Sequence, residues 1–442
     1  MSERTKKPYQ TVTSVYVSLI FSFYLLFFDK NGLAAISKAK AVCYETLTLG
    51  YIAAILVLLL VHGVRRRLRQ AEIKADLKRM PAAVWLILAY LLFTVVSACL
   101  SDYDTVWRGG IRREGVLTIS LYCVSFLLVS RFYRPARWHL YLFAAATTAF
   151  CAICVFQMLN INVFGLYPLG ENFTPADYVD KFIGTIGNID FTASFLCIAI
   201  PIFWCSILRL KDKQRFLLFL PLLLCLFVLW RISVAAGFVG ILIGTLLSLV
   251  VVLPCGRTTR MILLISFAAL LIAALIAVYF VRFKQTELRE IHNILHGKIK
   301  DSYASGRVYI WRRTLRAVPE HLWFGAGPDT MSYAAFARQE TAGGILKVFD
   351  AAHNEYLTIL YHQGVFALLA YLGALGASFV QWIRQAKEHP VAAIAGAAAA
   401  CYCIQAFFGI SQLITSPFFW CVFAVLTNAA NGKNAANSDG KN

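Results

Sequence analysis

Apolar stretches recur along almost the whole chain, and short polar segments separate them. A helix needs about 20 mainly apolar residues to cross the hydrocarbon layer of a membrane. The pattern predicts about twelve such spans, some of them short or interrupted by polar residues, near 10–29, 44–64, 81–100, 115–130, 139–159, 186–208, 216–230, 234–254, 261–281, 363–383, 391–410 and 414–428. We therefore predict an all-α polytopic integral membrane protein with about 12 transmembrane helices.

One long polar segment, residues 282–362, interrupts this pattern. Apolar residues three or four positions apart predict an amphipathic helix over 283–300, with a stripe of Leu288, Ile291, Leu295 and Ile299. A second helix is predicted over 307–318, because Pro319 disfavours helical geometry in the residue before it. A third short helix is predicted over 331–339. We therefore predict that this segment forms one large helical loop.

Lys and Arg in short connections predict the orientation, because cytoplasmic connections carry an excess of positive charge. The basic connections all fall on one side of the predicted spans, at 65–70, 131–137, 209–215, 256–260 and 384–387. We assign that side to the cytoplasm, together with both termini. The connections 101–114, 160–185 and 282–362 then face outward, and they hold most of the His, Trp and acidic residues that lie outside the spans.

Composition supports a membrane protein and excludes a water-soluble one. Of the 442 residues, 59% are hydrophobic and 15% are charged, which is too apolar for a soluble domain of this length. The formal net charge of +19 is largely explained by inner-face connections facing anionic lipid, so membrane lipid rather than nucleic acid is the expected partner. We predict a single integral membrane domain over 1–428, with 10–29 as a retained first helix, and a disordered cytoplasmic tail over 429–442.

Neither a disulfide framework nor a metal site is predicted. The twelve Cys lie in or beside apolar spans, and residues 282–362 contain none. Cys151 and Cys154 have redox-motif spacing but are better explained as small side chains in a helix within lipid. No Cys and His have the spacing of metal ligands, so no metal or cofactor is expected. Asp102 and Asp104 form a D-x-D pattern that fits a solvated turn better than a cation site.

An arginine cluster begins the second helix of the long loop. Arg307 and Trp311 share one helix face, and Arg313 lies nearby. Guanidinium groups bind phosphate in a bidentate manner, so the cluster suits a diphosphate near the membrane surface. A basic interfacial helix that only contacts lipid headgroups has the same pattern, and both interpretations stay open.

His353 lies where the long loop is predicted to re-enter the membrane, in the sequence Asp350-Ala-Ala-His353-Asn354-Glu-Tyr356. Histidine accepts a proton near neutral pH, and a carboxylate such as Asp350 can fix its tautomer. Asp350 or Asn354 as a helix N-cap beside an interfacial histidine is the alternative.

Further polar residues lie at the outer edges of spans. Arg231 follows Trp230, and it is either a second phosphate contact or a snorkelling arginine beside an interfacial tryptophan. Asn188 either caps the sixth span or lines a cavity. Arg113 precedes the fourth span and contacts either headgroups or residues of the site.

Together these segments resemble the O-antigen ligase and O-antigen polymerase superfamily of bacterial envelope glycan enzymes. The resemblance spans about 105–365 and rests on Arg307-x-x-x-Trp311, Pro319-Glu-His-x-x-Phe-Gly325-x-Gly327, His353-Asn354-x-Tyr356-Leu357 and Gly364, with Arg113-Glu-Gly115 and Gly187-Asn188 upstream. It implies that Arg307 contacts the diphosphate of the donor and that His353 activates the acceptor hydroxyl. The family's further arginine usually follows a Ser near 230–240, where this chain has Ile232-Ser233-Val234, so the role of Arg231 is less well supported.

The resemblance implies a metal-independent, inverting glycosyl transfer at the outer face of the cytoplasmic (inner) membrane. The donor would be a polyprenyl-diphosphate-linked glycan, and the acceptor a hydroxyl of a glycan, lipid or protein. A polymerase of lipid-linked repeat units would share this donor site. A flippase or transporter of lipid-linked oligosaccharide, or a non-catalytic assembly partner, are alternatives from other classes. Transporters usually bury their charged sites at mid-membrane between repeated halves, whereas here the polar residues gather in one loop.

Overall fold

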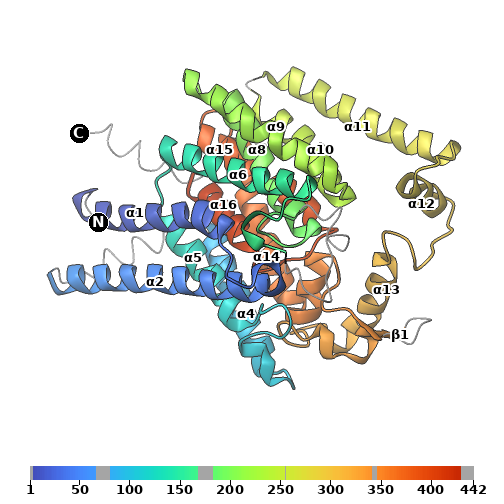
Figure 1. Ribbon diagram of the computed structural model, residues 1–442, viewed down its shortest axis with the longest axis horizontal. Coiled ribbons are helices and arrows are strands. Elements are labelled where there is room, and N and C mark those ends of the chain that lie inside the picture. The colour runs from blue at the N-terminus through green and yellow to red at the C-terminus, as the bar shows by residue number, and fades with distance from the viewer. Residues whose placement is uncertain (1–2, 66–79, 168–182, 254, 341–345, 430–442) are drawn as a thin grey trace.

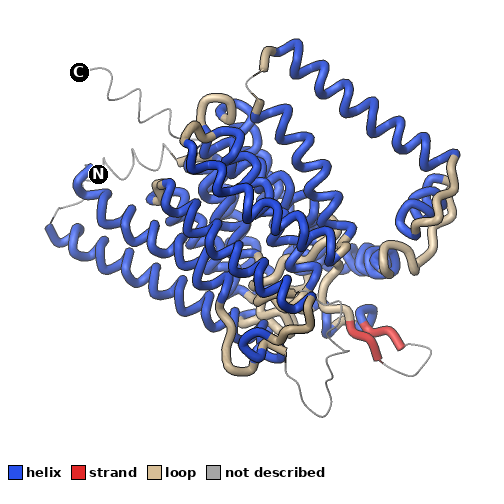
Figure 2. The backbone as a smooth tube through the Cα atoms, turned by 45° about the horizontal axis from the view of Figure 1, so that its top comes forward, coloured by secondary structure: helices blue, strands red, loops and turns tan. Residues whose placement is uncertain are grey.

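The apolar segments fold as helices that lie side by side, seen in ribbon form in Figure 1. The computed structural model describes residues 3–65, 80–167, 183–253, 255–340 and 346–429. Figure 2 shows helices throughout, apart from one small hairpin at the edge of the molecule. In a membrane each helix satisfies its own backbone hydrogen bonds, which is why the apolar sequence adopts this form.

The helices and strands have the following bounds. The first part of the bundle contains α1 (Glu3–Leu19), which a π-helical turn (Ile20–Tyr24) continues, α2 (Ile36–Arg65), α4 (Ala82–Cys99), α5 (Val116–Phe132), α6 (Arg137–Met158), α8 (Ile189–Arg209), α9 (Phe219–Ile232), α10 (Ala235–Val252) and α11 (Arg257–Phe280). The remaining elements are α12 (Thr286–Leu295), α13 (Arg307–Ala317), β1 (Arg338–Glu340), β2 (Leu346–Val348), α14 (Glu355–Gln385), α15 (Pro390–Ala406) and α16 (Ser416–Ala429).

Every predicted span falls on a helix of the structure. Within the described residues, eight helical segments are long and apolar enough to cross a membrane by length and composition, and three other apolar helices are shorter, namely α5, α15 and α16. The helical, polytopic character of the chain is thereby confirmed. The number of about twelve spans stays a prediction, as does the single-domain assignment. The predicted tail over 429–442 lies outside the described residues, except that Ala429 ends α16.

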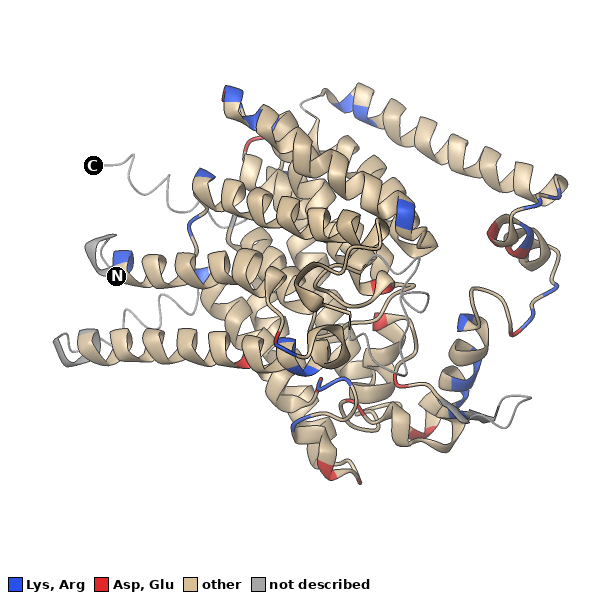
Figure 3. Ribbon diagram, viewed as in Figure 1, with Lys and Arg blue, Asp and Glu red and all other residues tan. Residues whose placement is uncertain are grey.

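The basic connections gather at one end of the bundle, which we call the basic end (131–137, 209–215, 252–260 and 384–389). Arg209 joins three of them, because its Nη1 donates to the carbonyl of Val252 at 3.3 Å and its Nη2 to that of Ala386 at 3.1 Å. Arg137 pairs with Asp212 at 3.0 Å. Figure 3 shows that Lys and Arg cluster at helix ends and are rare along the middle of the helices. The predicted basic residues 66–70 lie outside the described residues.

The first and last described helices, α1 and α16, reach the basic end near residues 9 and 428. Tyr9 of α1 stacks on Phe132 at the end of α5, with ring centroids 5.0 Å apart. Asn428 of α16 donates to the carbonyl of Tyr133 at 2.6 Å and accepts from Arg134 at 3.3 Å. The start of α1 and the end of α16 therefore lie beside these basic connections, whereas the cytoplasmic placement of this end and of both termini is still a prediction.

The long polar segment packs at the opposite end, which we call the loop end. It contains α12 and α13 as predicted, but α12 ends at Leu295, before Gly297 adopts a left-handed φ of 73°. The predicted helix over 331–339 is wrong. Two 3₁₀ turns (Met331–Tyr333 and Ala335–Ala337) lead there into β1, which pairs antiparallel with β2. Pairing with β2 in this short hairpin outweighs the weak local helix propensity. The two strands are also a small departure from the all-α prediction.

The loop is joined to the bundle at a break in α14. Gly364 has a φ of 81° and a ψ of 178°, which interrupts the helix and leaves nearby backbone groups available. The loop fills the gap, because Gly327 N donates to the carbonyl of His362 at 2.9 Å and Val365 N donates to that of Leu322 at 2.8 Å. The turn at 325–327 therefore anchors the loop to α14.

Substitution of Gly364 by alanine is expected to destabilise the protein. An alanine Cβ would lie 2.3 Å from the carbonyl oxygen of Trp323, and only glycine adopts this backbone region readily. The backbone strain alone costs about 1–3 kcal/mol. We expect a lower melting temperature in detergent for Gly364→Ala, whereas Gly376→Ala in the same helix, where a Cβ meets no atom within 4 Å, should melt like the wild type. Equal melting of the two variants would show that the break is not needed.

Candidate functional site

Arg307 is fixed at the loop end at the start of α13. The helix follows Gly306, whose φ is 84°. The Arg307 Nε donates to the carbonyl of Phe408 at 3.1 Å, its Nη1 donates to that of Ala304 at 3.2 Å, and its Nη2 lies 3.6 Å from Asp190 Oδ1. A guanidinium carries five N–H groups. These contacts orient the side chain, which is 16% exposed, and leave N–H donors on both terminal nitrogens for an anion.

His353 lies in the turn immediately before α14. It is half-buried and has a left-handed φ of 51°. The next residue, Asn354, caps α14, because its side chain accepts a hydrogen bond from Leu357 N at 2.9 Å. An N-cap at Asp350 or Asn354 was one of the two interpretations of the sequence. Tyr356 donates its hydroxyl to the carbonyl of Cys403 at 2.7 Å. The backbone around His353 is therefore held in place on its C-terminal side.

Arg307 and the His353 turn are attached to the same part of the bundle. Phe408, which accepts from Arg307, and Cys403, which accepts from Tyr356, both lie at the loop end of α15. Tyr309 of α13 also packs near Phe349, with ring centroids 5.9 Å apart. Arg307 and His353, the two candidate catalytic residues from the sequence, thus lie on segments that pack together at one end of the molecule.

Asp350 forms an ion pair that the sequence did not predict. Its Oδ1 accepts from Arg112 Nη2 at 2.7 Å, and the arginine side chain is 8% exposed. The pair joins the connection before α5 to the turn that carries His353, three residues further on. Arg112 therefore anchors the N-terminal side of that turn.

Trp311 and Arg313, two further residues of the predicted site, lie on α13. The ring of Trp311 packs on Phe407 and Phe408, with centroids 5.7 and 6.1 Å away. The exposed Arg313 lies over the ring of Tyr309 at 4.8 Å. These contacts support α13 against the end of α15 but do not by themselves indicate a ligand.

Three further residues occupy edge positions. Asn188 caps α8, because its Oδ1 accepts from Asp190 N at 2.8 Å. The exposed Arg231, near the end of α9, lies 5.7 Å over the ring of Trp230. Arg113 has a left-handed φ of 57°, and its carbonyl accepts from Thr118. Asn188 therefore has a structural role, and the phosphate contact predicted for Arg231 is still a prediction.

Gly325 and Gly327 serve the attachment of the loop. Gly325 has a φ of 76°, and a Cβ there would lie 2.3 Å from the backbone of His362. At Gly327, with a φ of 110°, a Cβ would lie 2.3 Å from Ser101 Oγ. Both glycines allow the loop backbone to lie close to its neighbours, Gly325 to α14 and Gly327 to Ser101, which follows α4.

A polar cavity of about 40 Å³ lies at the loop end, and the sequence did not predict it. Titratable residues from distant parts of the chain line it, namely Arg112, Glu114, Asp329, Glu355 and His362. It has room for water but not for a sugar. Glu355 accepts from the hydroxyls of Tyr371 and Tyr402 at 2.6 and 3.0 Å. Arg112 Nε and Nη1 are buried and have no hydrogen-bond partner among the described residues.

Burial changes the acidity of two carboxyl groups around this cavity. It raises the pKa of Glu114 to about 8, against the opposing effect of Arg112, while Asp329 and Glu355 add to the rise. Burial likewise raises the pKa of Asp329 to about 6, although Arg112 opposes this. Glu114 is half-buried and lines the cavity. The cluster can therefore exchange protons near neutral pH.

Stability should depend on pH through Glu114. The pKa of Glu114 in the folded state exceeds the ordinary value of 4.5. The protonated side chain therefore contributes to the free energy of unfolding at low pH, and this contribution is lost as pH rises through about 8. The glutamine in Glu114→Gln does not ionise, so the stability of this variant does not fall with pH for this reason. We expect the melting temperature of the variant, relative to the wild type, to increase between pH 5 and pH 8.5 in detergent. Glu287→Gln, an exposed change on α12, is the control, and a constant difference for Glu114→Gln would contradict the assignment.

The signal for this cavity in the sequence was weak. Arg112 and Glu114 are charged residues just before Gly115, and Asp329 follows Gly327-Pro328, without a motif that marks any of the three. Glu355 and His362 occupy the first turns of α14, where polar residues before a span are common. Within the described residues no group of three His, Cys, Asp or Glu is placed to hold a metal ion.

Residues 220–372 match the family model described as O-Antigen ligase. The matched segment begins in α9 and ends within α14, so it includes Arg231, Arg307, His353 and the whole long loop, whereas Arg113 and Asn188 precede it. The comparison with curated proteins found no match.

Proposed function

Because residues 220–372 support membership of the O-antigen ligase and polymerase superfamily, we propose that the chain is a membrane glycosyltransferase of the O-antigen ligase type. It transfers a glycan from a polyprenyl-diphosphate carrier to an acceptor hydroxyl at the outer face of the cytoplasmic membrane. One observation carries the proposal: the matched segment holds Arg307 and the His353 turn on adjoining parts of the loop end.

Arg307 binds the diphosphate of the donor. Its contacts with Phe408 and Ala304 orient the guanidinium, and its terminal nitrogens keep donors for phosphate oxygens. Asp190, at 3.6 Å, holds the side chain before the donor arrives. Charge-assisted bonds of this kind stabilise negative charge that develops on a leaving group. Arg231 and Arg313, both exposed at this end, are further contacts for the same diphosphate.

His353 is the general base. The acceptor oxygen forms a bond to the anomeric carbon while the bond from that carbon to the diphosphate oxygen breaks, and the hydroxyl proton passes to His353. The electron pair of the broken bond leaves with the polyprenyl diphosphate, which the arginines stabilise. A single displacement inverts the anomeric configuration. Because cations neutralise the leaving group, this step requires no metal ion.

The residues around the turn position the base. Arg112 fixes Asp350 on one side of His353, and the Asn354 cap and the Tyr356 hydroxyl fix the other side. Precise placement of a base matters because small displacements reduce rates strongly. In this proposal Asp350, Asn354, Tyr356, Trp311, Gly325 and Gly327 position the site and do not react.

Depletion of the protein in cells tests the function. If the protein transfers the glycan, polyprenyl-diphosphate-linked glycan accumulates on the outer face while the finished conjugate disappears. If the accumulated lipid-linked glycan has its full length, the protein is a ligase. If the accumulated lipid-linked glycan consists of single repeat units, the protein is a polymerase. Accumulation on the cytoplasmic face would instead identify a transporter, and unchanged levels of lipid-linked glycan would reject the proposal.

A further inference from the structure

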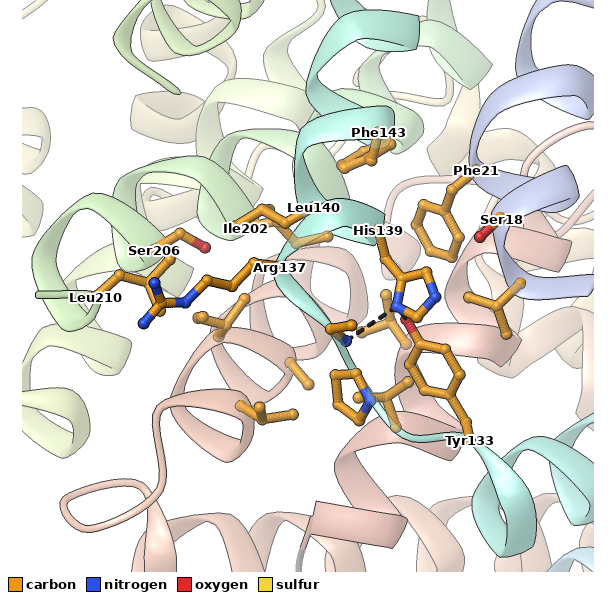
Figure 4. Close-up of a pocket in the computed structure, with 18 residues that line it drawn as sticks. Ser18, Phe21, Tyr133, Arg137, His139, Leu140, Phe143, Ile202, Ser206 and Leu210 are labelled. Atoms are coloured by element: carbon orange, nitrogen blue, oxygen red, sulfur yellow. Dashed lines mark hydrogen bonds between the residues drawn. The ribbon is translucent and has the colours of Figure 1, made fainter. Parts of the chain in front are cut away.

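A second cavity, of about 210 Å³, lies at the basic end, where Tyr133, Arg137 and Leu210 line it. Figure 4 shows its lining residues. It lies between α1, α6, α8, α15 and α16, and apolar side chains form most of its wall, for example Phe21, Leu140, Phe143, Ile202 and Ile394. An apolar cavity of about 150 Å³ in a soluble protein is large enough to bind benzene. This cavity therefore has room for a segment of a longer aliphatic chain.

Polar atoms in the wall indicate that its ligand is not a hydrocarbon alone. Ser18 Oγ, His139 Nε2 and Ser206 Oγ belong to residues that line the cavity, and all three atoms are buried without a hydrogen-bond partner among the described residues. Buried polar atoms nearly always have a partner, because an unsatisfied one costs free energy. In Figure 4, Ser206 lies on one side of the cavity and Ser18 and His139 on the other. A ligand with oxygen atoms would satisfy these groups.

His139 presents a hydrogen-bond donor. Its Nδ1 accepts from the backbone N–H of Ala136 at 3.0 Å and lies 3.1 Å from the hydroxyl of Tyr133. In a neutral imidazole one nitrogen accepts and the other donates, so Nε2 carries the proton. The unpartnered Nε2–H therefore requires an acceptor such as an ester carbonyl.

Arg137 supplies positive charge at the mouth of the cavity. It lines the cavity, is 66% exposed and pairs with Asp212 at 3.0 Å. The mouth lies among the basic connections, since Tyr133 and Leu210 also line it. Basic residues at a membrane surface attract anionic lipid headgroups.

We propose that this cavity binds one anionic glycerophospholipid from the leaflet at the basic end. One acyl chain fills the apolar part, an ester carbonyl accepts from His139 Nε2, and the phosphate contacts Arg137. The hydrocarbon tail of a polyprenyl carrier has no oxygen to satisfy His139, Ser18 and Ser206, so a phospholipid fits better. The site does not rest on the proposed transfer reaction.

Binding of phosphatidylglycerol to the purified full chain in detergent tests the proposal, with native mass spectrometry as the measurement. We expect the wild type to bind one molecule more tightly than it binds phosphatidylcholine. Arg137→Gln should weaken phosphatidylglycerol binding about tenfold or more, because a charge-assisted hydrogen bond is lost. Lys211→Gln, an exposed change at the same end that does not line the cavity, should bind like the wild type.

A second variant tests the cavity itself. Val425→Trp places a large side chain in the wall of the cavity and should exclude the acyl chain. The melting temperature of this variant without lipid shows whether the variant folds. If the variant does not fold, Arg137→Gln alone tests the proposal. Equal binding of phosphatidylglycerol by Arg137→Gln and the wild type would overturn the proposal. So would equal binding of phosphatidylcholine, or the recovery of a polyprenyl lipid from the cavity in place of phospholipid.

Discussion

Arg307→Ala is expected to reduce the rate of glycan transfer by about two to three orders of magnitude, the usual effect of losing one group that stabilises a developing anion. The variant removes the contacts with Phe408 and Asp190 together with the donors for the diphosphate. Transfer is measured with purified protein, a lipid-linked glycan donor and an acceptor, with kcat and KM determined separately.

Arg312→Ala is the matched control. Arg312 lies on the same helix and is 42% exposed, and its ion pair with Asp301 is 2.7 Å long and also exposed. Exposed pairs contribute little, so this variant should transfer like the wild type. A loss of activity of equal size in both variants would mean that the overall basic charge of α13, and not Arg307 in particular, supports transfer.

Replacement of His353 should lower kcat by about two to four orders of magnitude, the typical contribution of a general base, with a small effect on donor affinity. Asn is the informative replacement, because the left-handed φ of 51° at this position is tolerated by Asn far better than by Ala.

His296→Ala serves as the control for His353→Asn. His296 is an exposed histidine of the same long loop, and its ring stacks on Tyr279. His296→Ala should leave the rate unchanged. A His353→Asn variant that folds and transfers at the wild-type rate would remove His353 from the mechanism.

The helical bundle could be predicted from the sequence because each membrane helix satisfies its own backbone, so the local apolar pattern is sufficient. The hairpin of β1 and β2 could not, since its pairing depends on the return of the chain after residues 341–345. The Arg112–Asp350 ion pair joins residues 238 positions apart, and no local pattern indicates such a contact. Arg307 and His353 were identified through motifs, but their common attachment to α15 required the structure.

The break in α14 has a consequence for the order in which the protein is made. Residues 322–327 leave the ribosome before α14, yet their partners at 361–365 lie on that later helix. Backbone groups at the break stay unsatisfied until the two segments meet, which costs free energy in or near a membrane. The loop can therefore reach its final form only after α14 has been inserted, and substitutions at Gly325 or Gly364 should appear first as slow maturation of newly synthesised chains and only second as loss of activity.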